Sequence, residues 1–78
     1  MNHQLEAIRH KLLPCQGQKV RLHVRAERNR ILDTHGVLEG LYGEVFTVYV
    51  QSEDYARRYC YSYHDILTRH VSVIPVNL

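Results

Sequence analysis

Apolar positions near the start of the chain repeat with the period of a helix. They fall at the spacing of one helical stripe, at Leu5, Ile8, Leu12 and Leu13. Pro14 follows them, and proline disfavours helical geometry in the residue before it. We therefore expect an amphipathic helix over about residues 3–13, which must dock on the rest of the chain because about ten residues make a marginal helix alone.

From Lys19 the period changes to two. Val20, Leu22 and Val24 alternate with basic or polar residues, namely Lys19, Arg21, His23 and Arg25. This pattern predicts a strand with one wet, basic face. Further extended stretches are expected over residues 30–41, 45–50, 57–63 and 69–76. Gly36 and Gly40 in the second stretch allow it to bend, or allow another strand to approach closely.

A short helical turn is expected between the last two strands. Ser62 and Asp65 have the spacing of a capping box, in which the hydroxyl and the carboxylate each accept a backbone N–H. We expect the apolar pair Ile66 and Leu67 to fill one end of the fold. The order of elements predicts a mainly β fold, a small SH3-like or Sm-like five-stranded barrel with an N-terminal α-helix. The barrel would cover about residues 18–76 of a single domain spanning residues 1–78.

Length and composition limit the classes of function. The chain has 78 residues, is 45% hydrophobic and carries a formal charge of +2. A chain of this size has room for one thin core, which excludes a large enzyme with a cleft between domains. No apolar run approaches the ~20 residues that span a bilayer, and residues 1–14 lack a secretory signal. We therefore expect a cytoplasmic protein without membrane contact, with Cys15 and Cys60 as free thiols.

The residue pattern gives little support for catalysis or metal binding. The six histidines are scattered, and the usual spacings of zinc ligands do not occur. Cys60 precedes His64 by four residues, but nothing in the sequence supplies a depressed thiolate pKa. We expect no enzymatic activity, no cofactor and no metal site.

The charge is unevenly distributed along the chain. Residues 1–30 hold seven basic and two acidic residues, a net of +5, whereas residues 31–56 have a net of −5. Our first candidates for a partner-binding site lie on the first strand and in the loop after it, and they are Arg21, Arg25, Arg28 and Arg30. The acidic residue nearest to them in the sequence is Glu27. Such a cluster can bind phosphates of nucleic acid or an acidic patch of a protein, or remain a solvated basic face.

Tyrosines are the second unusual feature, because the chain has six. Arg57, Arg58 and Tyr59 are secondary binding candidates, since aromatic rings beside arginine form platforms on which bases stack. Tyrosines in a small β domain also serve as core or rim residues whose hydroxyls reach water. A total charge of +2 is lower than nucleic-acid-binding barrels usually carry.

Several short segments, taken in order, carry a family resemblance. The most specific is YSYHDILT at residues 61–68, and the others are GQKV at 17–20, RNR at 28–30, GVLE at 36–39 and VF at 45–46. Together they resemble the Veg proteins of Gram-positive bacteria over about residues 5–73. The resemblance implies a small cytoplasmic regulator linked to transcriptional control and to stimulation of biofilm formation. It also implies action against a transcriptional repressor through protein contact, and no catalytic residue.

Two hypotheses follow from the sequence. The first is a regulator that binds a protein partner, and the second is a small barrel that binds DNA or RNA directly. Salt dependence distinguishes them, because affinity that depends on many phosphate contacts falls steeply as salt rises. The sequence leaves the oligomeric state open, a homodimer included.

Overall fold

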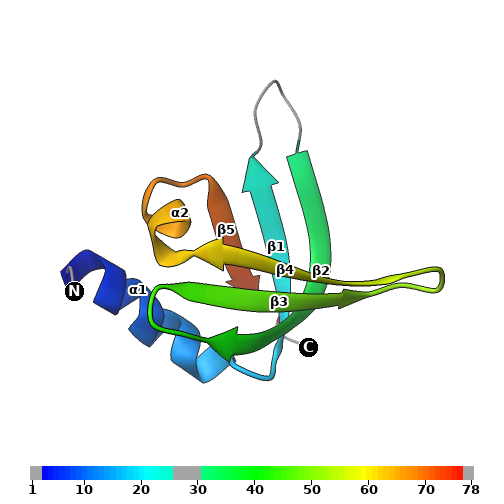
Figure 1. Ribbon diagram of the computed structural model, residues 1–78, viewed down its shortest axis with the longest axis horizontal. Helices are drawn as coiled ribbons and strands as arrows, with labels where there is room; N and C mark the ends of the chain where they lie inside the picture. Colours follow the sequence, from blue (N-terminus) through cyan, green and yellow to red (C-terminus); the bar gives the residue numbers. More distant parts are fainter. Residues whose placement is uncertain (1–2, 26–30, 77–78) are drawn as a thin grey trace.

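The computed structural model describes residues 3–25 and 31–76. Its elements follow the predicted order of one helix, four strands, a short helix and a last strand (Figure 1). They are α1 (His3–Leu12), β1 (Lys19–Arg25), β2 (Ile31–Leu41), β3 (Val45–Gln51), β4 (Ala56–Ser62), α2 (Tyr63–Leu67) and β5 (Val71–Pro75). A 3₁₀ turn over Leu13–Cys15 connects α1 to the sheet.

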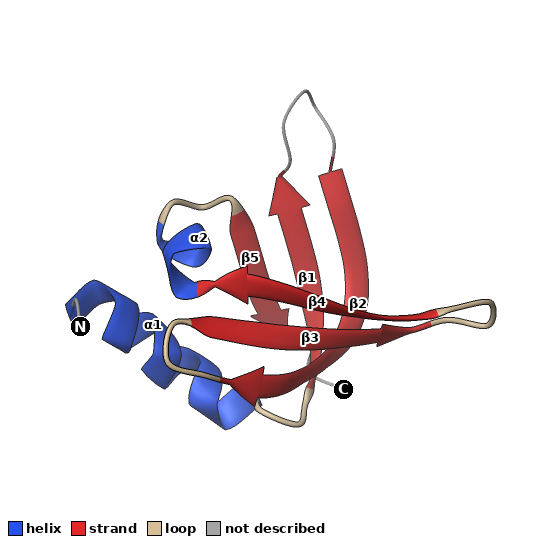
Figure 2. Ribbon diagram, viewed as in Figure 1, coloured by secondary structure: helices blue, strands red, loops and turns tan. Residues whose placement is uncertain are grey.

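The five strands form one antiparallel sheet in the order β4-β3-β2-β1-β5 (Figure 2). The mainly β fold with an N-terminal helix is therefore confirmed. Strands β4 and β5 are the two edges of the sheet, so the sheet is bent but not closed. The SH3-like or Sm-like barrel stays a prediction.

Strand β2 changes partners along its length. It pairs with β1 from Ile31 to Val37, and its pairing with β3 begins only at Val37, opposite Tyr49. Gly36 lies at this corner, and a Cβ there would come within 2.5 Å of the Tyr49 carbonyl oxygen and 2.8 Å of Cγ1 of Val48. The expected close approach of another strand at Gly36 is confirmed, and glycine is needed because a side chain has no room.

The core lies on one face of the sheet, as the alternating pattern predicts. Val20, Leu22 and Val24 of β1 are buried against three inward residues of β3, which are Phe46, Val48 and Val50. Helix α1 adds the buried Leu12 and the partly buried Leu5 and Ile8. The expectation for Leu13 is wrong. It lies on the 3₁₀ turn after the helix ends, where the stripe no longer faces the core, and 38% of its surface is exposed.

The predicted capping box is confirmed at the start of α2. The Ser62 hydroxyl accepts a hydrogen bond from the Asp65 amide, and the Ser62 amide donates to the Asp65 carboxylate, both at 3.1 Å. Because this cap begins the helix at Tyr63, β4 ends one residue earlier than predicted. The core residue of this corner is Tyr63, which is 1% exposed, whereas Ile66 and Leu67 are only half-buried.

The last strand is shorter than the predicted stretch over residues 69–76. It begins at Val71, because Arg69 has a φ of 67°, a left-handed backbone conformation that interrupts an extended strand. Pro75 ends β5 at the edge of the sheet, as expected for proline in a strand.

Candidate interaction surface

The face of the sheet opposite the core carries mostly polar and charged side chains, and three of the predicted site residues are among them. We call it the outer face. Strand alternation and register place these residues on it: Lys19, Arg21, His23, Arg25, Asp33, His35, Val37, Glu39, Tyr49, Gln51 and Arg58. Each of them is exposed or half-buried.

Arg21 is held in an ion pair across the β1–β2 hairpin. Its Nε lies 2.8 Å from Oδ1 of Asp33, and its Nη2 lies 2.5 Å from Oδ2 of the same residue. Nδ1 of His23 lies 3.4 Å from the same carboxylate. The hydrogen bond from Arg21 keeps the pKa of Asp33 well below its ordinary value. The expectation that Glu27 alone compensates this basic region is therefore wrong, because the hairpin brings Asp33 next to Arg21.

The other primary candidates are only partly described. Arg25 is exposed at the end of β1, opposite Ile31. Arg28 and Arg30 lie outside the described residues. The structure therefore places Arg21 and Arg25 on one face, and only Arg21 has an ion pair described for it.

The secondary candidates lie on opposite faces of β4. Arg58 is on the outer face, where its Nε lies 2.5 Å from the Glu39 carboxylate and its guanidinium carbon lies 5.5 Å from the centre of the Tyr49 ring. The hydrogen bond from Arg58 lowers the pKa of Glu39. Arg57 and Tyr59 are on the core side, opposite Val50 and Val48. The three residues therefore do not form one platform.

Tyr59 behaves as a residue at the rim of the core. The guanidinium carbon of Arg57 lies 5.9 Å from the centre of its ring. The ring is also stacked on that of Tyr61, with centres 6.3 Å apart and planes at 7°. Both tyrosines are half-buried and pack against the core, which agrees with the rim interpretation of these tyrosines.

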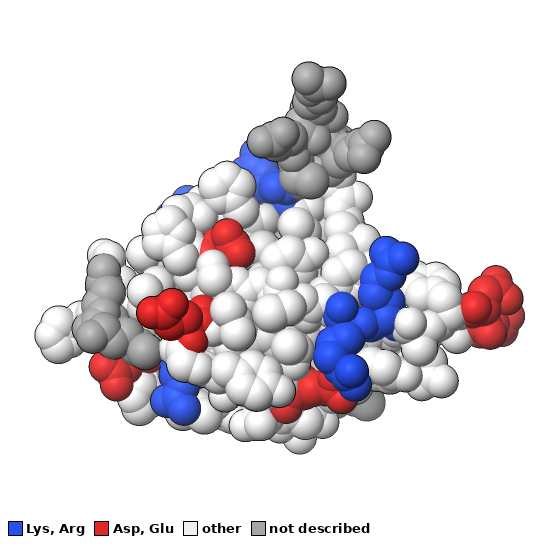
Figure 3. Space-filling view, viewed as in Figure 1, with Lys and Arg blue, Asp and Glu red and all other residues white. Residues whose placement is uncertain are grey.

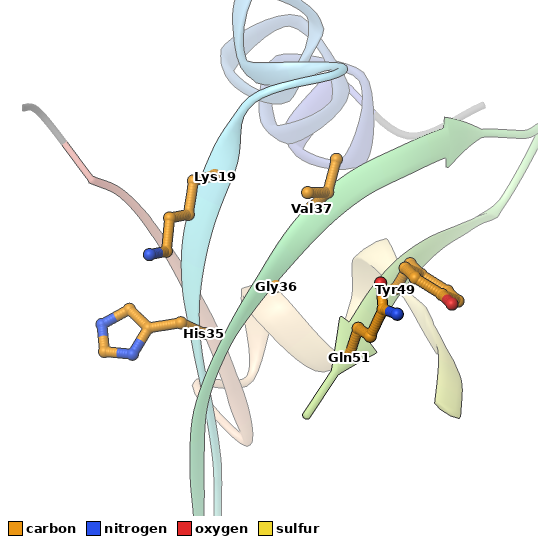
Figure 4. Close-up of a pocket in the computed structure, with 6 residues that line it drawn as sticks. All are labelled: Lys19, His35, Gly36, Val37, Tyr49 and Gln51. Carbon is orange, nitrogen blue, oxygen red and sulfur yellow. The ribbon is translucent and has the colours of Figure 1, made fainter. Parts of the chain in front are cut away.

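A shallow depression of about 220 Å³ lies on the outer face at the corner of β2. Figure 4 shows Lys19 and His35 on one side of β2 and Tyr49 with Gln51 on the other, beside Val37. Sequence analysis missed this site. The signal for it was the glycine at position 36, which marks the corner, together with the outward positions on either side of it.

Charges of both signs lie side by side on the outer face. On the face seen in Figure 3, basic side chains lie next to acidic ones. The two ion pairs Arg21–Asp33 and Arg58–Glu39 show this on the outer face, with the apolar Val37 and the ring of Tyr49 between them. Such a surface offers hydrogen bonds, charges of both signs and an apolar centre, which is the composition of a protein interface.

Other kinds of site are weakly supported. Within residues 3–25 and 31–76, no group of three His, Cys, Asp or Glu side chains could hold a metal ion. Cys15 is half-buried, Cys60 is exposed, and both are free thiols. Among the described residues, no helix has the length and apolar character needed to cross a membrane.

Comparison with known proteins decides the family. Residues 3–74 match the family described as biofilm formation stimulator VEG. The chain belongs to the Veg family. The resemblance seen in the sequence is thereby confirmed, and membership implies a regulatory protein that stimulates biofilm formation. A comparison with curated proteins finds no match.

Proposed function

We propose that this Veg protein is a non-enzymatic cytoplasmic regulator of gene expression that acts by contact with a transcriptional repressor. The observation that supports this proposal is the outer face. Its two ion-paired arginines, Arg21 and Arg58, lie on either side of an apolar centre at Val37 and Tyr49. A partner protein can match such a surface with charges of both signs. Because occupying the surface of a repressor needs no chemical step, the proposal requires no catalytic residue.

Direct binding of nucleic acid is the alternative. A phosphate track needs cations that are free to pair with phosphates. Arg21 and Arg58 are each engaged by a carboxylate of the same chain, and that carboxylate would repel a phosphate. This arrangement favours a protein partner over DNA or RNA.

The test has two parts that use the purified full chain. In the first, the tagged protein captures partners from nuclease-treated and untreated lysates of the same bacterium. The captured regulator is then purified and titrated against the protein at low and moderate salt. We expect one transcriptional repressor to be retained after nuclease treatment and to bind in the titration.

In the second part, the protein is titrated against duplex and single-stranded DNA and RNA at low salt. Binding that weakens steeply with salt would contradict the proposal, provided that it disappears in the variant in which Arg21, Arg25, Arg28 and Arg30 are changed to Gln. A variant with Lys11→Gln and Arg69→Gln controls for loss of positive charge at exposed positions that are not binding candidates.

A further inference from the structure

Within residues 3–25 and 31–76, the first half of β2 has a neighbouring strand along only one of its two edges. The Leu38 amide donates a hydrogen bond to the Gln18 carbonyl at 3.1 Å, toward β1. Because the direction of the backbone groups alternates along an antiparallel strand, every second residue before Leu38 also turns its N–H and C=O groups toward β1. Those of the residues in between, Ile31, Asp33 and His35, point the other way. Within the described chain, the ladder on that side begins only at Val37.

The neighbouring strand β3 leaves β2 at the same corner. Tyr49 is opposite Val37, so the register would place Gln51 opposite His35, but the described pairing ends before that position. Beyond the corner, β3 runs into the hairpin with β4, which Figure 1 shows projecting away from β2. In the part of the chain that the structure describes, the row of backbone donors and acceptors along residues 31–35 therefore has no strand beside it.

We propose that this edge of β2 binds an extended segment of the protein partner as an added β-strand. Unpaired N–H and C=O groups along an edge are satisfied by another extended backbone, which is a recurrent mode of peptide recognition. This inference rests on the proposed function, because the occupant is a segment of the regulator that the Veg protein contacts.

Side chains beside the edge specify the chemistry of the segment. At the corner, Lys19, His35 and Gln51 surround the depression of about 220 Å³, so the residue opposite His35 is acidic. At the other end, Ile31 is 63% exposed and takes an apolar neighbour. Asp33, between them, is already neutralised by Arg21. The segment thus carries an acidic and an apolar residue four positions apart on one face.

The edge of β5 is less suited to the same role. The Val76 amide donates a hydrogen bond to the Lys19 carbonyl at 3.1 Å, toward β1. By the same alternation, the backbone groups of Val71, Val73 and Pro75 point away from β1. Proline has no N–H to offer, and proline is one of the devices that protect a sheet edge from pairing. The free edge of β2 has no proline.

The test uses a displayed library of random seven-residue peptides as the probe. Peptides are selected on the wild-type protein and then measured individually against His35→Ala and His35→Pro. The His35 amide points away from β1, so proline there removes a donor on the open edge and no hydrogen bond within the fold. We expect His35→Pro to weaken binding by about tenfold or more relative to His35→Ala. Denaturation of both variants checks that they are folded.

A charge reversal and amide exchange complete the experiment. Selection on Lys19→Glu should remove the preference for an acidic residue. In the complex with the best peptide, the amides of Ile31, Asp33 and His35 should become protected from exchange, whereas those of Leu32 and Thr34 should be protected already.

Failure to select peptides, equal binding to both His35 variants, or unchanged exchange at Ile31, Asp33 and His35 would overturn the inference. A concentration-dependent dimer lost in His35→Pro would also overturn it, by assigning the edge to a second copy of this chain. None of these four results would contradict the proposed function if the repressor still binds, since the outer face would then carry the contact.

Discussion

The hydroxyl of Tyr63 donates a hydrogen bond to the backbone carbonyl of Tyr42 at 2.8 Å. This bond connects the first residue of α2 to the turn between β2 and β3. The ring of Tyr63 stacks on Phe46, with centres 6.0 Å apart and planes at 20°. Burial raises the pKa of Tyr63, so the hydroxyl stays protonated and able to donate. One side chain thus fixes the corner of the fold by packing and by hydrogen bonding.

We expect Tyr63→Phe to lower the free energy of unfolding by about 1 kcal/mol, because it removes one hydrogen bond. Tyr63→Ala should cost about 3 to 5 kcal/mol, since it also empties a core position. Tyr55→Ala is the matched control, because Tyr55 is 53% exposed and its loss should change stability by less than about 0.5 kcal/mol. Urea denaturation measures all three. Equal stabilities for Tyr63→Ala and the control would show that this corner does not support the fold.

Local patterns predicted much of the fold. Alternation identified the buried residues of β1, and the spacing of Ser62 and Asp65 identified the capping box at the start of α2. These features depend on neighbours a few residues apart, which a sequence displays directly. Leu67 shows the limit. Its apolar character predicted that it would help to fill one end of the fold, but Leu67 is half-buried and Tyr63 is the buried residue of this corner.

The candidate site was harder to predict, because it depends on strand register. The ion pair of Arg21 with Asp33 needs residues 12 apart to lie on neighbouring strands. Alternation alone places Arg57 and Arg58 on opposite faces, but it does not say which face meets the core. Closure of the sheet is also a long-range property, and here β4 and β5 remain unpaired with each other.

Gly36→Ala should be strongly destabilising. The added methyl would lie within 3 Å of the Tyr49 carbonyl oxygen and of both Val48 and Val50, and the backbone atom cannot rotate away. Overpacking of this kind typically costs about 1 to 3 kcal/mol. Gly43→Ala is the control, because a Cβ there meets nothing within 4 Å. Thermal unfolding of the two variants makes the comparison. If both kept the parent melting temperature, β2 and β3 would not be in close contact at Gly36.

Acid should remove the contribution of the Arg21–Asp33 pair. The pKa of Asp33 is lower in the folded chain than the ordinary ~3.9 of an unfolded aspartate. The pair therefore contributes to stability above the unfolded pKa, and this contribution is lost as pH falls through the folded pKa. We expect the parent to be more stable than Asp33→Asn near neutral pH and the difference to shrink below about pH 4.

Denaturation of the parent and Asp33→Asn across this pH range, at low and high salt, measures the effect. Asp54→Asn serves as control, because Asp54 lies in the exposed turn between β3 and β4. Salt should reduce the difference, since the pair is exposed to solvent. A difference that stays constant from neutral to acidic pH would contradict the ion-pair explanation.

The outer face can be tested with two apolar residues of equal exposure. Val37 lies beside the depression on this face, whereas Leu13 lies on the 3₁₀ turn, and each is 38% exposed. We expect Val37→Asp to weaken binding of the captured repressor, because it replaces the apolar centre of the interface with a charged, strongly hydrated group. Leu13→Asp should leave binding nearly unchanged.

Titration of the repressor with each variant, together with biofilm mass in cells that express it, gives the readout. Both variants must first show unfolding midpoints close to the parent, so that a loss of binding reports the surface and not the fold. Weakening in Val37→Asp alone supports contact through the outer face. Equal weakening in both variants, or weakening in Leu13→Asp alone, would indicate that the contact lies on the side of the molecule that carries the 3₁₀ turn.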